Sequence, residues 1–558
     1  MKSSSAFPSL AFSPLFGKLL EKRGLVSSEA IRAFLFPDLK ALLDPSSMKG
    51  MDEAVQRIRK AVSVKELILI HGDYDVDGVT GAAIISRLLQ KIGGRFKVFL
   101  PERERDGYGV SARAIREGAE AGVTLLITVD CGVAATEQIQ IARDLGVDVI
   151  VIDHHKIPAA GLPAANIILN PLQADCPYQF KELSAAGLAF KLCQSILGEE
   201  AFELLDLAAI SSIGDVVPLC SENRIIVKKG LEVIAAQKKP GIAALLAVSK
   251  VRGPQVSVTQ VAFQLAPRIN AAGRMSSPDS ALRLLVTDSL KEASSLAQIL
   301  ESENEARKQI ERRCTQEAIQ WVERSVNFNR DKVIVAASEN WHVGVIGIVA
   351  ARLVEKFNRP AIVIGFQKGV GKGSGRSILG FNLYHALQFS KDTLIEAGGH
   401  AQAAGLSITP AQVDAFRAKI NLYAKDNLNA AHLSTKIDFD LEIGLHEIDE
   451  VLLKELALLE PHGAGNSHPK FFTRGLKLVS AMKKSPIGTY EAVVGDGQKS
   501  RQMQFREEDY VKLAGIPSGV SFEAIYDIRK KSWNGIDSVV LYAKQIEPQG
   551  PDLPLRFF

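Results

Sequence analysis

His71-Gly-Asp-Tyr-Asp-Val-Asp-Gly78 directly follows a short apolar run at residues 67–70. An apolar run that is closed by Gly and Asp predicts a buried strand ending in a loop. Four ionisable side chains therefore crowd this strand end: His71, Asp73, Asp75 and Asp77. Carboxylates so close raise one another's pKa, and a divalent cation removes the conflict because carboxylate and imidazole groups are its natural ligands. Taken alone, the stretch is equally compatible with an Asp-rich turn that has a Gly hinge.

Two further apolar runs, at residues 123–129 and 147–152, also end in ionisable residues. Asp130-Cys-Gly follows the first run, and Asp153-His-His155 follows the second. Alternating strands and helices predict a parallel sheet with right-handed crossovers, and the strand C-termini of such a sheet meet at one edge, where ligands bind. We therefore expect the three ionisable strand ends to converge, which favours a metal site over a simple turn. The helix-like stretches between the runs lie at residues 78–92, 111–121 and 134–145.

Composition is typical of a soluble globular protein: of 558 residues, 46% are hydrophobic and 23% are charged. This length predicts roughly three to four domains. The formal net charge of +4 is too small to indicate a nucleic-acid partner by itself. The five Cys residues are scattered, which argues against a disulfide framework or a structural zinc site and favours a reducing cytoplasm. No apolar run approaches the ~20 residues of a membrane span, and prolines interrupt the apolar N-terminus, so neither a membrane anchor nor a signal peptide is expected.

Changes of pattern along the chain predict an α/β protein in five parts. The region at 290–324 has no Pro or Gly and favours one long, solvated helix that bridges two domains. Asp215 follows a helical pattern at residues 201–210, where a loop carboxylate could reach the same sheet edge, although a helix-ending polar residue is the simpler interpretation. The five parts are an N-terminal helical extension (1–50), a parallel-sheet α/β domain (51–220), a helical connector (221–325), a second α/β domain (326–428) and a C-terminal OB-like β-barrel (429–558).

The second α/β domain contains two glycine-rich stretches. Gly371-Lys-Gly-Ser-Gly-Arg-Ser377 lacks the order of a Walker loop, but its glycines would let backbone N–H groups approach an anion, and Lys372 and Arg376 add charge. Gly398-Gly-His400 predicts a tight turn nearby. Further on, short β-like runs separated by turn residues predict the small barrel, a fold that often binds oligonucleotides.

Taken in order, these residues resemble the four motifs of the DHH phosphoesterase family: His71-x-x-x-Asp75-x-Asp77, Asp130, Asp153-His154-His155 and Asp215. Gly398-Gly399-His400 resembles the signature of the DHHA1 domain that accompanies it. Within the family, the chain is most similar to the 5′→3′ exonucleases specific for single-stranded DNA. One departure is His462, where this group usually has Phe. The matches that support this similarity lie at residues 101–109, 265–274, 341–347, 373–377 and 461–466.

The resemblance implies a two-metal site for Mn²⁺ or Mg²⁺, and carboxylate-rich ligation by itself favours these ions over zinc. Two such cations lower the pKa of a shared water and neutralise the charge that develops during phosphodiester hydrolysis. The implied ligands are Asp130 as the bridging carboxylate, then Asp77, His154 and Asp215 in one site, and Asp75 with His71 in the other. Asp153 is expected to hold the loop or to orient His154, and Asp73 keeps a structural turn role.

The resemblance also implies which residues bind the nucleic acid. His155 is implied to hydrogen-bond the phosphoryl oxygens and stabilise the transition state, and Arg274 to contact the scissile or adjacent phosphate. Arg presents a bidentate fork to phosphate. The implied residues of a pocket for the 5′-phosphate and the DNA end are Arg103, Ser374 and Arg376, with Tyr108 stacking on the terminal base and His400 as a further DNA contact.

The implied function is a metal-dependent 5′→3′ exonuclease that hydrolyses single-stranded DNA to 5′-mononucleotides in DNA recombination and repair. Two alternatives stay open: a DHH phosphoesterase that acts on short oligonucleotides or small phosphate compounds, and a non-catalytic DHH-fold scaffold that binds DNA. The length of the chain argues against the first, and the presence of every motif carboxylate and His argues against the second. A RecQ-type helicase and a single-strand-binding protein are the expected partners, for a cytoplasmic monomer with no membrane partner.

Overall fold

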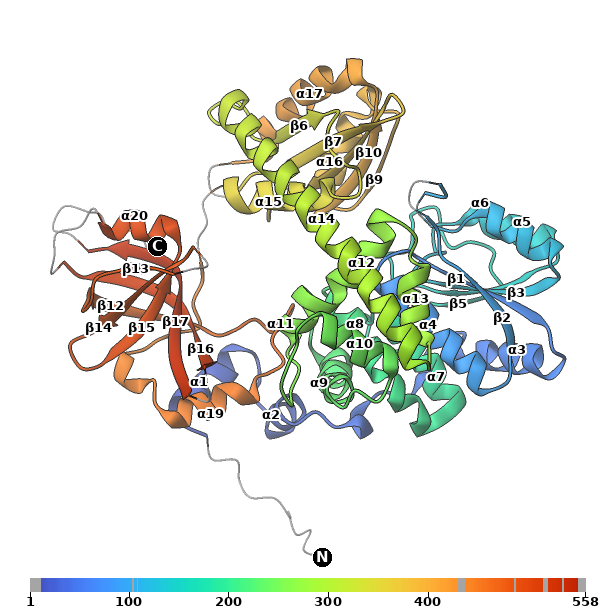
Figure 1. The fold of residues 1–558 in the computed structure, drawn as a ribbon, viewed down its shortest axis with the longest axis horizontal. Coiled ribbons are helices and arrows are strands. Elements are labelled where there is room, and N and C mark those ends of the chain that lie inside the picture. Colours follow the sequence, from blue (N-terminus) through green and yellow to red (C-terminus); the bar gives the residue numbers. More distant parts are fainter. Residues whose placement is uncertain are drawn as a thin grey trace, which may run out of the picture.

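The protein consists of three bodies, each built around a β-sheet (Figure 1). A computed structural model describes residues 12–102, 105–107, 109–429, 433, 437–485, 488–514, 520–533 and 536–549. One long helix, α14 (Leu290–Ser325), runs from the first body to the second, which confirms the predicted bridging helix (Figure 1). Within the described residues, no helix combines the length and the apolar composition needed to cross a membrane.

The first body contains a five-stranded sheet in which all neighbouring strands are parallel, as predicted. Its strand order is β2-β1-β3-β4-β5, so the winding of the chain reverses between β1 and β3. In a sheet of this kind, ligands bind outside the C-terminal strand ends at the point of reversal. The strands are β1 (Leu67–Gly72), β2 (Arg95–Phe99), β3 (Val123–Val129), β4 (Asp148–Ile152) and β5 (Ile167–Leu169).

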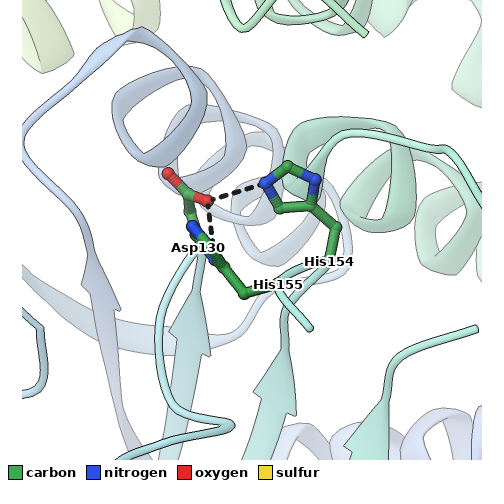
Figure 2. A group of neighbouring side chains, drawn as sticks. All are labelled: Asp130, His154 and His155. Carbon is green, nitrogen blue, oxygen red and sulfur yellow. Dashed lines mark ion pairs between the residues drawn. The ribbon is translucent and has the colours of Figure 1, made fainter. Parts of the chain in front are cut away.

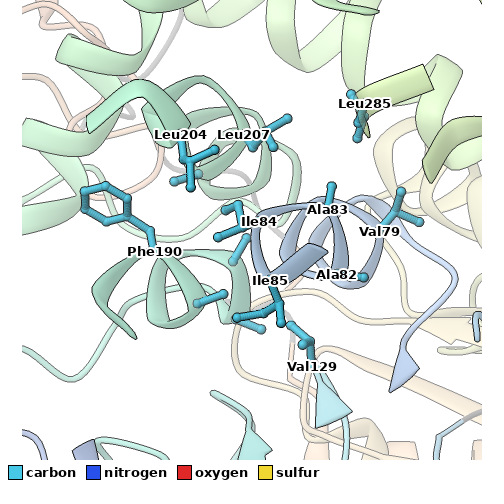
Figure 3. Packing of buried hydrophobic residues seen from close by; sticks show 14 of the residues in the cluster. Val79, Ala82, Ala83, Ile84, Ile85, Val129, Phe190, Leu204, Leu207 and Leu285 are labelled. Atoms are coloured by element: carbon cyan, nitrogen blue, oxygen red, sulfur yellow. The ribbon is translucent and has the colours of Figure 1, made fainter. Parts of the chain in front are cut away.

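Helices cover both faces of this sheet. On one face, α3 (Met51–Ser63), α4 (Val76–Lys91) and α7 (Ala185–Leu197) share one apolar core with the strands. On the other face, α5 (Ala112–Glu120) and α6 (Thr136–Asp144) pack in a second cluster. Figure 3 shows the side chains of α4 among residues of β3, α7, α8 and α13. This burial fixes the start of α4, where Asp75 and Asp77 lie.

The helical connector follows the first sheet and closes over the start of α4. The backbone N–H of Val76 donates to Asn270 Oδ1 at 2.8 Å, which ties α4 to α12. Arg268 Nε donates to Glu301 Oε2 at 2.5 Å, which ties α12 to α14. The connector and the helix before it comprise α8 (Leu205–Gly214), α9 (Ser221–Ala235), α10 (Pro240–Val248), α11 (Val258–Gln260), α12 (Ala266–Met275) and α13 (Asp279–Val286).

The second body has a mixed sheet with the order β6-β7-β8-β10-β9, in which only β6 and β7 are parallel. The predicted tight turn at His400 joins β9 to β10. Its strands are β6 (Ile334–Ser338), β7 (Ala361–Gln367), β8 (Val370–Arg376), β9 (Glu396–Gly399) and β10 (Ala403–Ile408). Its helices are α15 (Ile346–Phe357), α16 (Leu383–Phe389) and α17 (Val413–Asn427).

The first glycine-rich stretch of this body is a strand, β8, and lies between β7 and β10. Its glycines leave room for apolar neighbours: a Cβ on Gly373 would lie 2.7 Å from Leu406, and one on Gly375 would lie 2.7 Å from Leu383. The expectation that these glycines bring backbone N–H groups to an anion is therefore replaced by a packing role. The Ser and Arg side chains between them remain partly exposed.

The third body is a seven-stranded sheet that pairs β12 with both β16 and β14. The N-terminal helices α1 (Pro14–Lys22) and α2 (Ser28–Leu35) belong to this body, because Phe16, Leu19 and Leu35 share its apolar core (Figure 1). The remaining elements are β11 (Leu441–Glu442), α19 (Glu450–Leu458), β12 (Lys470–Leu478), β13 (Lys483–Lys484), β14 (Tyr490–Gly495), β15 (Ser500–Phe505), α20 (Glu507–Ala514), β16 (Phe522–Trp533) and β17 (Ile536–Pro548).

Candidate metal and phosphate-binding site

The loop from β1 to α4 lies at the point where the winding of the first sheet reverses. Asp75 is the N-cap of α4, and its Oδ1 accepts from the backbone N–H of Asp77 at 2.9 Å and of Gly78 at 3.2 Å. Asp73 and Asp77 are both buried. The loop therefore turns three carboxylates of one short stretch toward the C-terminal edge of the sheet.

Asp77 is held by elements more than a hundred residues away. The backbone N–H groups of Ala185 and Ala186, in the first turn of α7, donate to its two carboxylate oxygens at 2.8 and 2.7 Å. Ser211 Oγ of α8 also donates to Oδ1 of Asp77, at 2.6 Å. A helix N-terminus attracts negative charge, and these three hydrogen bonds fix the direction of the Asp77 carboxylate.

Asp130 follows β3 and faces the two histidines that follow β4 (Figure 2). Its backbone has a positive φ of 64°, which turns the side chain out of the line of the strand. His154 Nε2 lies 3.4 Å from Asp130 Oδ1, and His155 Nδ1 lies 3.8 Å from the same oxygen. Oδ1 of Asp130 is buried and has no hydrogen-bond donor among the described residues. A buried oxygen without a donor is expected where that oxygen binds a cation.

Three overlapping groups of side chains could hold metal ions, with the ligand atoms of each group within 4.8 Å of one another. His154 Nε2 lies 3.6 Å from Asp77 Oδ2 and 3.7 Å from Asp215 Oδ2. The structure thus brings together the set predicted for one metal site, including Asp215 at the C-terminal end of α8. The groups are Asp77, His154 and Asp215; Asp130, His154 and His155; and Asp73, Asp75 and Asp130.

The third group contains Asp73 where the sequence predicts His71. His71 is fully buried, and its Nε2 accepts from the backbone N–H of Ser111 at 3.0 Å. Its Nδ1 lies 3.8 Å from Cys131 Sγ, and burial lowers the pKa of the ring to about 4. A ligand role for His71 stays a prediction. The sequence predicts a structural turn role for Asp73, whereas its carboxylate lies within 4.8 Å of those of Asp75 and Asp130.

The carboxylates of the cluster share a strongly unfavourable environment when no cation is bound. Burial, followed by repulsion from Asp77 and Asp75, raises the pKa of Asp130 well above its usual range. The same causes raise the pKa of Asp215 to about 8, although His155 opposes the shift. Oxygen ligands of this number suit Mn²⁺ or Mg²⁺, and a divalent cation would compensate the excess negative charge. The residues present therefore fit the predicted metals.

Asp153 orients His155. His155 Nδ1 donates to Asp153 Oδ1 at 2.8 Å, and the backbone N–H groups of Val133 and His155 donate to the same carboxylate. Burial opposes the protonated ring, but the hydrogen bond and charge of Asp153 outweigh it, so the pKa of His155 rises to about 9. The sequence predicts that Asp153 holds the loop or orients His154; its contacts with the backbone N–H groups of Val133 and His155 fit the first role, and the imidazole that it contacts is that of His155.

On the second body, Ser374 and Arg376 lie side by side on β8. Arg376 Nη1 donates to Ser374 Oγ at 3.2 Å. A Cβ added to Gly347, in the first turn of α15, would lie 3.0 Å from Ser374 Oγ and 3.4 Å from Arg376 Nη2. A cationic side chain, a hydroxyl and a helix N-terminus therefore meet at one place, which suits an anion.

One hydrogen bond and one electrostatic interaction link the second body to the first. Arg274 Nη1 of α12 donates to the backbone O of Gly344 at 3.2 Å. Burial lowers the pKa of His400, and the positive charges of Arg376, Lys156 and His155 lower it further, so His400 lies within electrostatic reach of the loop after β4. Arg103 and Tyr108, which are predicted to bind the DNA end, lie outside the described residues.

Family models match all three bodies of the chain. The DHH family, N-terminal domain, matches residues 67–212, the DHHA1 domain matches residues 330–426, and the RecJ OB domain matches residues 439–545. Both predicted α/β domains and the OB-like barrel are thereby confirmed.

Curated relatives named single-stranded-DNA-specific exonuclease RecJ cover most of the chain. The Bacillus subtilis protein is 40% identical over 86% of this chain, and the chain spans 61% of its length. The Dickeya dadantii protein is 35% identical over 82% of this chain and 83% of its own length. The crystal structure of Thermus thermophilus RecJ in complex with Mn²⁺ superposes with a TM-score of 0.83 at 29% identity, covering 97% of this chain and 76% of that one. With an acidic cluster at the sheet reversal, three matching domains and relatives of this similarity, the chain belongs to the RecJ family of DHH-domain proteins.

Proposed function

We propose that this protein is a metal-dependent 5′→3′ exonuclease that hydrolyses single-stranded DNA to 5′-mononucleotides in recombination and repair. One observation carries the proposal: Asp77, Asp130, His154 and Asp215, which come from four separate segments, converge at the sheet reversal with ligand atoms a few ångströms apart. The relatives whose names state this activity support it.

The metal ligands are proposed to be Asp77, His154 and Asp215 for one ion, Asp75 and Asp73 for a second, and Asp130 for both, with His71 as a further candidate. Bound Mn²⁺ or Mg²⁺ supplies charge neutralisation at the phosphate and an activated water. The chain's own part is to hold these carboxylates close together and in fixed directions. The N-terminus of α7 and Ser211 do so for Asp77.

His155 and Arg274 are proposed to act on the phosphate itself. Nδ1–H of His155 donates to Asp153, and the pKa of about 9 keeps the ring protonated, so Nε2–H is a second donor that can hydrogen-bond a phosphoryl oxygen. Arg274 stands at the contact between the two bodies, where a strand passing from one to the other would meet it. Both groups stabilise negative charge that grows during hydrolysis.

The second body is proposed to recognise the 5′ end of the strand. Ser374 and Arg376, beside the first turn of α15, would bind the terminal phosphate, with Arg103, Tyr108 and His400 completing the contacts to the strand end. A 5′-phosphate carries more charge than an internal phosphodiester, so this pocket would select the end. The expected partners, a RecQ-type helicase and a single-strand-binding protein, and the expected monomeric, cytoplasmic state belong to the same proposal.

The direct test uses the purified protein and a 5′-phosphorylated, 3′-labelled single-stranded oligonucleotide with Mn²⁺, Mg²⁺ or EDTA. Metal-dependent release of mononucleotides from the 5′ end is the expected result. Turnover of dinucleotides alone would indicate a phosphoesterase of small substrates, and DNA binding without turnover of either substrate would indicate a scaffold. Equal rates on a blunt duplex would contradict single-strand specificity.

A further inference from the structure

The loop that carries Asp215 has an unusual backbone. Asp215 ends α8, and Val216 directly after it has a φ of 62° with 67% of its surface exposed. A β-branched side chain is unfavourable in this left-handed region, so the conformation persists only if the chain on both sides is held. On the side of α8, the loop is held by a hydrogen bond from the backbone N–H of Val217 to the backbone O of Ser212, at 3.2 Å.

On the far side, the loop is held by a turn of the third body. The backbone N–H of Leu219 donates to the backbone O of Ala464 at 2.7 Å. The contact is close on both sides of Ala464: a Cβ on Gly463 would lie 2.6 Å from Leu219 Cδ1, and one on Gly465, whose φ is +69°, would lie 3.1 Å from Pro218 Cβ. Leu219 is itself buried in the core of the first body.

Three sets of hydrogen bonds fix the turn at residues 463–465. Gly463 and Asn466 exchange backbone hydrogen bonds at 3.0 and 3.1 Å. Asn466 Nδ2 donates to the backbone O atoms of Leu459 and Pro461, and Arg23 of the N-terminal segment donates to Asn466 Oδ1 at 2.5 Å. The buried guanidinium of Arg224, in α9, donates to the backbone O atoms of Leu458, Leu459, Glu460 and Pro461.

We propose that the turn at residues 463–465 positions Asp215, so that the third body helps to build the metal site in addition to any contact it makes with DNA. The inference rests on the proposed function, in which Asp215 is a metal ligand. Leu219 is four residues from Asp215, and the strained Val216 lies between them. A shift of Leu219 away from Ala464 therefore frees Val216 to relax, and the carboxylate of Asp215 turns away from His154.

A connection that only tethered a DNA-binding domain would not need this geometry. A tether requires a chain of sufficient length, whereas this contact is a direct hydrogen bond to a buried residue beside the cluster, with no space for a methyl group. The two interpretations differ in what they predict for metal binding without DNA.

The experiment compares Gly463→Ala, Leu219→Ala and the double variant with the wild-type protein. Gly17→Ala is the matched control, because Gly17 lies in α1 of the same body and a Cβ there meets nothing within 4 Å. Mn²⁺ binding is titrated by electron paramagnetic resonance without DNA, and kcat and KM are measured on the 5′-phosphorylated oligonucleotide. Leu219→Val replaces Gly463→Ala if thermal melts show that the latter does not fold.

The expected result for Gly463→Ala is a loss of about tenfold or more in Mn²⁺ affinity at one site, a matching fall in kcat and an unchanged KM. In the double variant the two losses should not multiply, because removal of the Leu219 side chain makes room for the new methyl group. Unchanged Mn²⁺ binding with a raised KM would overturn the inference and leave the proposed function intact. A wild-type protein that bound no Mn²⁺ would overturn both.

Discussion

At the scale of single residues, the charge of Asp130 stabilises the metal-bound protein and destabilises the metal-free one. We expect Asp130→Asn to raise the unfolding temperature in EDTA, because it removes a buried carboxylate whose pKa is raised by burial and by its acidic neighbours. The same change should abolish most of the stabilisation by Mn²⁺ and lower hydrolysis by at least about a hundredfold. Calorimetric melts with and without Mn²⁺ check both effects.

Asp144→Asn, at an exposed position on α6, is the control for removal of one negative charge. It should leave both melts and the hydrolysis rate as they are in the wild-type protein. If Asp130→Asn lowered the unfolding temperature in EDTA, Asp130 would be stabilised by contacts within the protein, and the electrostatic account of the cluster would be wrong.

Arg376 should distinguish a strand with a 5′-phosphate from one without it. Arg376→Ala is expected to lower kcat/KM on a 5′-phosphorylated strand by about ten- to a hundredfold, the usual cost of losing a charged hydrogen bond. On a 5′-hydroxyl strand the change should be much smaller. The matched control is Lys372→Ala on the same strand, whose Nζ contacts Ser407 Oγ. Equal losses on the two substrates would remove Arg376 from the end pocket.

The strand-end positions of the metal cluster could be predicted, because Asp130 and Asp153-His-His155 follow apolar runs and the topology of a parallel sheet brings such strand ends together. The assignment of individual ligands, Asp215 among them, came from the family resemblance. The groups that hold these ligands could not be predicted. Ala185, Ala186 and Ser211 act on Asp77 through backbone N–H groups and one hydroxyl. Neither kind of group leaves a pattern in the sequence, and the contacts span more than a hundred residues.

At the scale of elements, strand β8 depends on residues that have no side chain. Gly373→Ala is expected to destabilise the protein by about 1–3 kcal/mol, since the new methyl group meets Leu406 in a packed layer. Gly405→Ala is the control on the neighbouring strand β10, where the nearest atom to an added Cβ is 4.0 Å away. Chemical denaturation of the two variants provides the measurement, and equal losses would contradict the packing argument.

Strongly apolar strands and the long helix were predictable as elements, whereas β8 and β2 were not. β8 alternates glycine with polar residues, so its pattern resembles a loop, and only its position between β7 and β10 makes it a strand. β2 is an edge strand with partly exposed side chains, so its sequence lacks a continuous apolar run. Tertiary context decides such segments more than local preference does.

At the scale of the whole molecule, His462 connects stability to pH. Burial, followed by the positive charges of His468, Arg23 and Arg224, lowers the pKa of His462 to about 3. In the unfolded chain a histidine takes up its proton near pH 6.5. The stability that neutral His462 contributes is therefore complete above pH 6.5 and is lost as the pH falls toward 3. Between pH 7 and pH 5 we expect a loss of about 1–2 kcal/mol from this residue.

His462→Phe should flatten that decline, because Phe keeps the ring and removes the titrating group. Denaturant titrations of both proteins at pH 7 and pH 5, in EDTA, give the comparison, and the contributions of the acidic cluster cancel in the difference. His385→Phe, at an exposed position of α16, should decline as the wild-type protein does. A parallel decline of His462→Phe would exclude His462 as the source.

The sequence does not show which parts of the chain pack against each other when they are far apart in sequence. An apolar helix face predicts burial but not against which part of the chain, so the sequence predicts for residues 1–50 only an N-terminal helical extension. In the structure, Phe16, Leu19 and Leu35 are buried in the core of the third body instead. The contact between Leu219 and Ala464 could not be predicted from the sequence either, because a glycine-rich turn does not indicate what packs against it.

The docking of α1 and α2 on the third body has a consequence for biosynthesis. A ribosome makes these helices before both α/β domains, yet the apolar residues that cover them lie between Ile443 and Ile546. Chains fold from the N-terminus as they emerge. The nascent chain must therefore carry an uncovered apolar segment throughout translation of both α/β domains. Leu219 also lacks Ala464 during this time, so the neighbourhood of Asp215 is completed only when the third body has been translated.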